Sequence, residues 1–580
     1  MNLLKNIIIV GIFSLYTPSV FAQAYLNLDF ESQRGNKLNR WAIPNVGATY
    51  TLDSLEKISG SYSLKVNKTN PSDSIGAFFR NEFPVEYAIG RELILKGKIK
   101  TTTKDKGNAG LMLIVLGENN KLLLYDDMKD RRLTGNSDWQ EIYIKAKIDS
   151  NAKFILFGGI CAGQVTAWFD DFKITIDGKE YNASAPRIEA LSKSEIEVLR
   201  EYCYPLKSFD PMLKDQKDLK ILDKLVADAK IVALGEVSHG SSEIFKMKHR
   251  LIQYLAEKNN FDIFSMEANM PEAYQLNVEI AHNRTNNLNL LNRLYFWCWN
   301  TSEISDMIRW MGHYNKYGRR LTFSGFDMQY YQGSIRELKD GFGYQEIIHK
   351  EIDALSHILA KIHELFFKTG QITIPSEQAG EISEHLKNIK VAIDKKYTGL
   401  NNDRKEWLLR NVRILEQFLD QSISTRDKYM AENLMWILGQ NKDSKVISWA
   451  HNGHIKKKHN AMGQYLSSIL QDKYIAMGFA FYEGEYTAGG EKGVTTYPAE
   501  TAGLGSYEYF LNSINEPFFI LDLKRIKEDR PPELNWLLSD LEFRTVGAVK
   551  IDREFRNFNI ANNFDYLIFI KKSTNSHLLN

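Results

Sequence analysis

Two apolar runs that each end in titratable side chains place the strongest constraint on the fold. The run VALGEVSHG stops at Glu236 and His239, between two glycines. Far along the chain, the run KVISWAHNGHI ends in His451 and His454. Parallel α/β sheets build their active sites at the carboxyl ends of their strands. We therefore expect both runs to be strands of one mostly parallel sheet, with the active site of an enzyme where they end.

The chain is long enough for two domains, and its two parts follow different patterns. Its 580 residues exceed the size at which a single hydrophobic core keeps growing. Short β-rich runs alternate with turn residues over 24–181, which predicts an antiparallel β-sandwich. A polar linker follows at 182–195. Apolar strands alternate with helices over 196–571, which predicts an α/β domain.

The strands of this α/β domain can be placed by their apolar runs, and its helices by their amphipathic periodicity. The predicted strands are 230–236, 261–267, 321–327, 445–451, 473–481 and 518–523. A helix is predicted at 241–258. Further amphipathic patterns predict a helical insertion beside the sheet between about 335 and 440, with helices at 345–368, 403–421 and 429–438.

The first 22 residues have the pattern of a secretory leader. Lys5 gives the positive start, 7–16 the apolar stretch, and Val20-Phe21-Ala22 a cleavage site with small residues. We expect a mature protein that begins near Gln23 and is exported to the periplasm or the medium. No later window offers about 20 apolar residues in a row, so no membrane span is predicted.

Charge and cysteine content exclude some classes of partner and of stabilisation. The formal net charge is only +2, from 74 basic against 72 acidic residues, so no strong field attracts nucleic acid or anionic lipid. Cys161, Cys203 and Cys298 are too few and too scattered for a disulfide framework. We expect packing to supply the stability.

Six polar residues lie at or just after the ends of four predicted strands: Glu236, His239, Glu267, Asp327, His451 and His454. Two chemistries fit this set. In the first, a neutral imidazole takes a proton from water while carboxylates orient the ring. In the second, the His and Glu side chains hold a divalent metal that activates water. The residue pattern leaves both open.

Five motifs together resemble the erythromycin esterase family over about 196–571. They are GEVSHG at 235–240, the helix at 245–255, MEA at 266–268, RDKYMAEN at 426–433 and AHNGH at 450–454. The resemblance implies hydrolysis of an ester, in the best-known members the lactone of macrolide antibiotics, which they inactivate as a resistance mechanism. It also implies a reaction without an obligatory metal, which favours the first chemistry, although a divalent metal stays possible.

The resemblance also assigns roles to individual residues. His239 matches the proposed general base, with Glu236 as its carboxylate partner and Glu267 as the glutamate of the second strand. His451 and His454 match a later histidine pair, and His451 has its own claim to be the base. Substrate-binding roles are predicted for Asp327, Arg426 and Asn433, with helix capping or helix packing as the alternatives for Asp327 and Asn433.

One position departs from the family pattern. Lys248 lies nine residues after His239, where the macrolide-acting members have an arginine. A lysine keeps the positive charge but loses the planar fork of the guanidinium. We predict that Lys248 lies near the developing oxyanion. This departure, the leader and the added sandwich together suggest a native ester other than a macrolide.

The sandwich resembles the jelly-roll modules described as carbohydrate-binding or galactose-binding-like. This resemblance implies a glycan as a second partner, with Trp139 and Trp168 as stacking platforms and Asp170 and Asp171 as ligands of a structural calcium. The alternative is a structural appendage. A surface glycan-binding protein without catalytic activity is therefore the third hypothesis for the whole chain, beside the esterase and the metal-dependent hydrolase.

Overall fold

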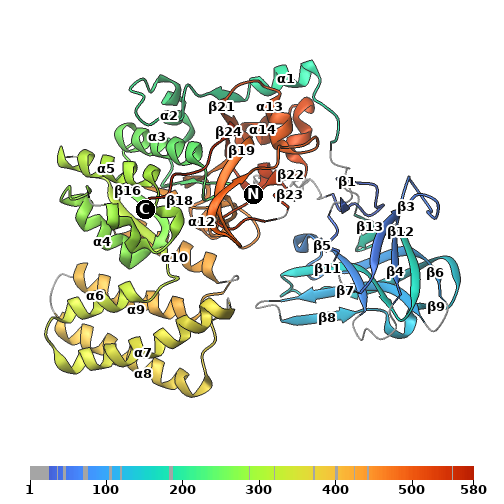
Figure 1. Cartoon of the computed structure of the whole chain (residues 1–580), viewed down its shortest axis with the longest axis horizontal. Coiled ribbons are helices and arrows are strands. Elements are labelled where there is room, and N and C mark those ends of the chain that lie inside the picture. The colour runs from blue at the N-terminus through green and yellow to red at the C-terminus, as the bar shows by residue number, and fades with distance from the viewer. Residues whose placement is uncertain are drawn as a thin grey trace, which may run out of the picture. The chain divides into compact units, whose positions relative to one another are not determined.

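The computed structural model divides the chain into two compact units, Met1–Ala185 and Pro186–Asn580 (Figure 1). The predicted leader lies outside the residues that the structure describes. Those residues are 25–579, except for 35–36, 39, 44–46, 70–75, 104–106, 118–120, 182–186, 287, 319, 370–371, 399–402, 423–424, 441–442 and 552.

The first unit is an antiparallel β-sandwich, as predicted. One sheet has the order β10-β6-β12-β4-β3, with β13 paired to β12, and the other has the order β5-β11-β7-β8, with β9 paired to β7. A short pair, β1 and β2, lies apart. The strands are β1 (Gln33–Arg34), β2 (Lys37–Leu38), β3 (Thr49–Asp53), β4 (Ser63–Lys68), β5 (Ala77–Phe83), β6 (Glu92–Thr102), β7 (Asn108–Leu116), β8 (Leu122–Asp126), β9 (Leu133–Thr134), β10 (Ser137–Lys147), β11 (Phe154–Ala162), β12 (Val165–Ile176) and β13 (Lys179–Glu180).

Alternating side chains build the sandwich core. Along β6, every second residue from Leu93 to Thr101 is buried, which is the period of a strand with one face inside. Aromatic rings fill the space between the sheets: Trp41 stacks on Phe30 with ring centroids 4.9 Å apart and meets Phe79 edge-on. This packing explains why the unit needs no disulfide.

The residues predicted to serve sugar and calcium in this unit are engaged in internal contacts. Trp168 is 9% exposed; its indole N–H donates to Asp53 at 2.9 Å and the Lys65 ammonium lies 5.1 Å from its ring. Asp170 is fully buried and accepts bonds from three backbone N–H groups. Asp171 pairs with Lys98 and with Lys173. Trp168, Asp170 and Asp171 therefore have structural roles, which is the alternative that the sequence analysis set beside sugar and calcium binding.

The second unit is built on a mostly parallel sheet, again as predicted. Its order is β14-β21-β24-β19-β15-β18-β16-β17, with β20 paired to β19. The five pairings from β24 to β17 are parallel, and β21 runs antiparallel to β24. The strands are β14 (Cys203–Pro205), β15 (Ile231–Leu234), β16 (Ile263–Asn269), β17 (Thr322–Asp327), β18 (Val446–Trp449), β19 (Tyr474–Gly490), β20 (Gly493–Pro498), β21 (Phe518–Asp522) and β24 (Tyr566–Ser573), and a separate pair comprises β22 (Leu541–Arg544) and β23 (Phe555–Phe558).

Each face of this sheet is covered by its own hydrophobic core. Val232 and Leu234 of β15 belong to one core, and Ile231 and Ala233 to the other. A strand that is buried on both faces reads as an uninterrupted apolar run, which is why these strands were recognisable in the sequence.

Helices flank the sheet and form the insertion. The helices α6 to α9 lie together and share a core of their own (Figure 1). The helices are α1 (Lys193–Arg200), α2 (Leu222–Leu225), α3 (Ser242–Lys258), α4 (Met270–Ala281), α5 (Ser302–Lys316), α6 (Gln332–Phe342), α7 (Glu346–Thr369), α8 (Ser376–Lys396), α9 (Asp403–Leu419), α10 (Arg426–Gly439), α11 (Asn452–Ile455), α12 (Met462–Leu470), α13 (Tyr507–Asn512), α14 (Leu523–Asp529) and α15 (Ile560–Asn563). No helix in the described part of the chain is long and apolar enough to cross a membrane.

Several elements differ from the sequence prediction, which named neither the short strands β14, β22 and β23 nor helices such as α4, α5 and α8. Strand β24 was not predicted, although it lies in the middle of the sheet between β21 and β19. Strand β19 continues to Gly490 and pairs with β20 as a hairpin. Helix α1 begins at Lys193, within the segment predicted as linker, because Ser192 and Glu195 form a capping box there. Cys161, Cys203 and Cys298 are buried free thiols.

Candidate active site

The predicted site residues come together at the carboxyl ends of four neighbouring strands. The order β15-β18-β16-β17 brings the loop after β15 next to the segment after β18, and both next to Glu267 on β16. Glycine makes the close approach possible at Gly235, where a Cβ would lie 2.1 Å from the side-chain oxygen of Asn452. Asn452 donates its backbone N–H to the Glu236 carbonyl and so ties the two loops together.

Glu236 is a fully buried carboxylate with three donors around it. Its Oε1 lies 2.5 Å from His239 Nδ1. Its Oε2 accepts a bond from Lys248 Nζ at 2.7 Å and another from the Trp449 indole N–H at 2.6 Å. Burial alone would raise the pKa of Glu236, but the Lys248 ammonium and the His239 contact hold this pKa below its usual value. Glu236 is therefore ionised and able to orient the His239 ring.

His239 and His451 face each other across the site. Their ring centroids are 5.2 Å apart, and the Trp299 ring lies 5.9 Å from His239 on another side. Burial lowers the pKa of His451 to about 3, and the nearby His239 and His454 act in the same direction. Gly453 donates its N–H to His451 Nδ1 at 3.1 Å, so the neutral ring of His451 carries its proton on Nε2.

Glu267 organises the second half of the site. Its Oε1 lies 2.8 Å from Arg426 Nη2 and 3.2 Å from His454 Nε2, and its Oε2 accepts the backbone N–H of His451. Although burial alone would raise its pKa, His454 and Arg426 hold the pKa of Glu267 well below its usual value. Asp327 accepts bonds from Nε and Nη2 of Arg426 at 3.1 and 2.7 Å. Asp327 is fully buried and holds Arg426, so it has no surface with which to bind a substrate directly.

His454 lies between two carboxylates. Asp427 contacts its Nδ1 at 2.9 Å, and Glu267 contacts its Nε2. Burial alone would lower the pKa of His454, but Glu267 and Asp427 raise it to about 10. His454 is therefore an imidazolium at neutral pH and, with Arg426, supplies fixed positive charge. The charge-bearing side chains of both residues stay about one-fifth exposed.

Two predicted residues have other positions than the sequence suggested. Lys248 has no exposed surface and lies behind Glu236, 4.2 Å from the centroid of the Trp449 ring. It cannot touch a substrate oxyanion, so the prediction for Lys248 is corrected: it positions Glu236. Asn433 is also fully buried; it donates to the Phe326 carbonyl and accepts from Arg410. It fixes helix packing, the alternative that its spacing left open.

Three residues of the site were not predicted as such. Trp449 is the last residue of β18 and donates to Glu236. Asp427 lies next to Arg426 in the motif RDKYMAEN. A carboxylate directly beside a predicted substrate-binding residue could have indicated that Asp427 belongs to the site. Trp299 is buried in the hydrophobic core, forms a wall beside His239 and donates to the Glu267 carbonyl at 3.1 Å. Nothing local in the sequence marks its position.

The described residues contain no ligand set that would support the metal-dependent alternative. In that part of the chain, no group of three or more His, Cys, Asp or Glu side chains could hold a metal ion. The carboxylates that would be needed, Glu236 and Glu267, already have partners on both oxygens. No observation therefore favours this alternative over the first chemistry.

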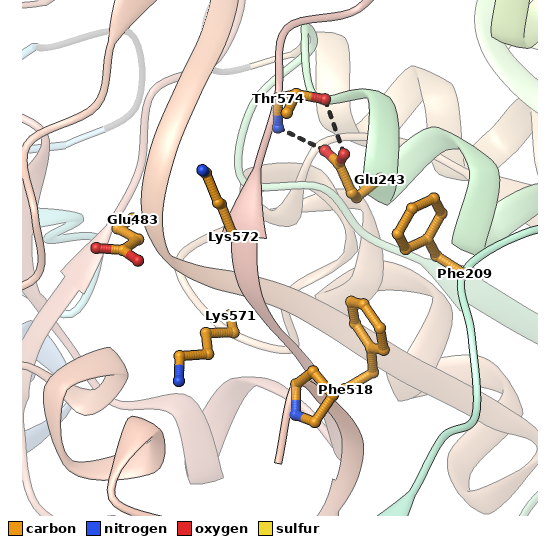
Figure 2. Close-up of a pocket in the computed structure, with 8 residues that line it drawn as sticks. Phe209, Glu243, Glu483, Phe518, Lys571, Lys572 and Thr574 are labelled. Atoms are coloured by element: carbon orange, nitrogen blue, oxygen red, sulfur yellow. Dashed lines mark hydrogen bonds between the residues drawn. The ribbon is translucent and has the colours of Figure 1, made fainter. Parts of the chain in front are cut away.

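A cleft of about 390 Å³ has no histidine among its lining residues (Figure 2). Phe209 and Phe518 form its apolar side, Lys571 and Lys572 lie opposite, and Glu243 and Thr574 close one end. None of the predicted site residues lines this cleft. We therefore take the histidine cluster as the candidate active site, because of its hydrogen bonds and ion pairs and not because of the size of a cavity.

Comparisons with known proteins agree with this architecture. A family model described as erythromycin esterase matches residues 256–573, which include Glu267, Arg426, His451 and His454 but begin after His239. Erythromycin esterase type II of Escherichia coli is 27% identical over 317 residues, which are 47% of this chain and 73% of that protein. A crystal structure of a succinoglycan biosynthesis protein is 25% identical with a TM-score of 0.57, and covers 67% of this chain and 98% of its own.

One further comparison concerns the N-terminal unit alone. A xylan-binding domain of carbohydrate-binding module family 22 covers 28% of this chain and 99% of its own length, with 17% identity and a TM-score of 0.22. A glycan partner for this chain stays a prediction.

Proposed function

Because the chain belongs to the erythromycin esterase family, we propose that it hydrolyses carboxylic esters or lactones by means of a water molecule that His239 activates. One observation carries the proposal most strongly: His239 Nδ1 lies 2.5 Å from the buried carboxylate of Glu236. An imidazole that is oriented by a carboxylate is a common general base for water near neutral pH.

The hydrogen bonds around His239 define which nitrogen acts. Glu236 is ionised, so the Nδ1–H of His239 donates to it. The lone pair of the neutral ring then lies on Nε2, which no other described residue is seen to bond. Nε2 takes a proton from water, and the hydroxide attacks the ester carbonyl carbon. His451 is a poorer candidate for the base, because its Nδ1 already accepts the Gly453 N–H and its Nε2 carries the proton.

The tetrahedral intermediate carries negative charge on the former carbonyl oxygen. In this proposal the cations of Arg426 and His454 stabilise that charge, whereas the Nε2–H of His451 is directed at the Val237 carbonyl, 3.4 Å away. His239, now protonated, returns its proton to the leaving alkoxide as the carbon–oxygen bond breaks. The products are a carboxylic acid and an alcohol, or one hydroxy acid when the substrate is a lactone. Glu267 and Asp327 do not react but hold the cations in place.

The native substrate and the site of action belong to the proposal as well. Lys248 is buried behind Glu236, so its difference from arginine does not act on the substrate by direct contact. A macrolide lactone and a simpler ester are both compatible with the groups at the rim. Export rests on the leader pattern of residues 1–22, and a mature N-terminus at Gln23, measured by intact mass, is the expected outcome.

Replacement of His239 tests the reaction. We expect His239→Ala to lower kcat about 10²- to 10⁴-fold on model esters and macrolides, because the general base is gone. Its unfolding temperature should stay near that of the wild type, since His239 lies in a loop at the rim. The matched control is His313→Ala, which removes an exposed imidazole on α5. Hydrolysis by His239→Ala at the rate of the control would refute the proposal.

A further inference from the structure

Residues 574–579 run along two stretches of chain that each follow a residue of the site. The first stretch, 240–243, comes directly after His239, and the second, 300–303, comes directly after Trp299. We call residues 574–579 the strap. The strap begins immediately after the last residue that the family model matches, Ser573.

Backbone hydrogen bonds join the strap to the first stretch. Ser576 N–H donates to the Gly240 carbonyl at 2.8 Å, and Ser242 N–H donates to the Thr574 carbonyl at 2.9 Å, as in a short antiparallel pair. Thr487 of β19 also donates to the Gly240 carbonyl, at 2.9 Å. The carbonyl that follows His239 is thus held by two N–H groups from two different segments.

A buried carboxylate anchors the start of the strap. Glu243, in the first turn of α3, accepts the backbone N–H of Thr574 at 2.5 Å and its hydroxyl at 2.7 Å (Figure 2). Both oxygens of this 8% exposed residue are therefore used by one strap residue. Bonds to an ionised acceptor are about twice as strong as bonds between neutral groups, so this is a firm attachment.

A second buried carboxylate anchors the strap to the Trp299 side. Glu303, in the first turn of α5, accepts from the Ser242 hydroxyl at 2.6 Å and contacts His577 Nδ1 at 2.8 Å. Burial alone would raise the pKa of Glu303, but the bonds from Ser242 and His577 hold it below its usual value. Glu303 thereby connects α3, α5 and the strap at a single point.

Backbone pairing continues along the second stretch. Ser302 N–H donates to the His577 carbonyl at 2.8 Å, and Leu579 N–H donates to the Asn300 carbonyl at 2.9 Å. The residue before this stretch, Trp299, forms the wall beside His239. The strap therefore connects the segment that carries His239 with the segment that carries its neighbouring wall.

We propose that the strap is a positioning segment that holds the His239 loop against Trp299, so that the imidazole keeps its bond to Glu236 and its place for the attacking water. This inference rests on the proposed ester hydrolysis. Its residues act through His239 and do not touch the substrate. A displacement of about 1 Å in a reacting group can cost on the order of 100-fold in rate, so loss of the strap should affect kcat.

Removal of the strap is the first test. A chain that stops after Ser573 should lose about 10- to 100-fold in kcat on the best model ester. KM should change by less than about twofold, because the charged groups of Arg426 and His454 remain in place. The control is Leu578→Ala, which trims an exposed side chain and keeps every backbone bond of the strap. Unchanged kcat in the truncated chain would overturn the inference.

Single substitutions keep the test decisive if the truncated chain does not fold. Thr574→Val removes the hydroxyl bond to Glu243, and Glu303→Gln removes the charge that connects the strap with α3 and α5. We expect both to lower kcat severalfold, while Thr574→Ser restores the hydroxyl and the wild-type rate. If Thr574→Ser were as slow as Thr574→Val, the loss of kcat would come from altered packing and not from the lost hydroxyl bond. That result would contradict the inference.

Hydrogen exchange separates the strap from the reaction itself. The amides of Ser242 and Ser302 donate to strap carbonyls, so both should exchange faster in the truncated chain and in Glu303→Gln, with β15 unchanged. This readout needs no substrate. If the full chain cleaves no ester, the proposed function fails while exchange still reports on the strap. If ester cleavage is found and neither exchange nor kcat changes, the strap inference alone fails.

Discussion

His239 and His454 lie on the same rim but in opposite environments. His239 has one carboxylate, Glu236, at Nδ1, whereas His454 has Asp427 at Nδ1 and Glu267 at Nε2. An imidazole with one carboxylate keeps a nitrogen available for a proton from water. An imidazole between two carboxylates is held as a cation and cannot act as a base at neutral pH. The number of carboxylates, and not the residue type, decides the role.

The two halves of the site, one at the end of β15 and the other at the end of β16, also differ in the groups that surround their glutamates. Glu236 is bonded by Lys248 and Trp449 from behind, and neither can reach a substrate. Glu267 is bonded by Arg426 and His454, whose side chains are partly exposed. In the proposed reaction, the β15 half therefore supplies the base, and the β16 half presents positive charge. Three substitutions test this division, in order of expected effect.

Glu236→Gln should have the largest effect. The amide can still contact His239, but it cannot stabilise the imidazolium that forms during the reaction, and it can favour the wrong tautomer. We expect kcat to fall about 10³- to 10⁴-fold, as in other carboxylate–histidine pairs. Steady-state kinetics at neutral pH measure this, with Glu346→Gln at an exposed position of α7 as the control. A fall of less than about tenfold would place the base elsewhere.

His454→Gln should change the pH dependence of stability. The pKa of His454 is about 10 in the folded chain and about 6.5 when unfolded. Its contribution to folding is thus complete below about pH 6.5 and is lost as pH rises to about 10. Urea unfolding at several pH values should show the wild type losing roughly 3–5 kcal/mol more than His454→Gln over this window. Parallel curves would mean that His454 is not held as a cation.

Asn433→Ala should have the smallest effect and should leave catalysis intact. The substitution removes a buried donor to the Phe326 carbonyl behind Arg426, so we expect about 1–3 kcal/mol of lost stability. Because Asn433 is fully buried, kcat and KM should stay at wild-type values. Arg426→Met, at the start of the same helix and with a partly exposed side chain, should instead raise KM. A raised KM in Asn433→Ala would restore the substrate-binding role that its motif suggested.

The sequence alone determined the sheet of the second unit and the polar residues at the carboxyl ends of its strands, because both are encoded by short local patterns. Strands buried on both faces appear as apolar runs, and the polar residues that follow them, such as Glu236, Glu267 and His451, mark the carboxyl ends. Strand β24 was missed although it is central, since the run 566–570 resembles any short buried segment. Within the sandwich, alternation was sufficient to predict the sheets but not the partners of Trp168.

Only the tertiary structure decided what each polar residue does. The order β15-β18-β16 brings Trp449 next to Glu236, and helix α3 brings Lys248 to the same carboxylate oxygen, where it is a buried support rather than a substrate contact. The same strand order places one carboxylate, Glu236, beside His239 and two carboxylates, Asp427 and Glu267, beside His454. The spacing of residues in the sequence gives neither the distance between the loops after β15 and β18, which are about 200 residues apart, nor the burial that shifts the pKa of a side chain. These two quantities distinguish an imidazole that can act as a base from one that is held as a cation.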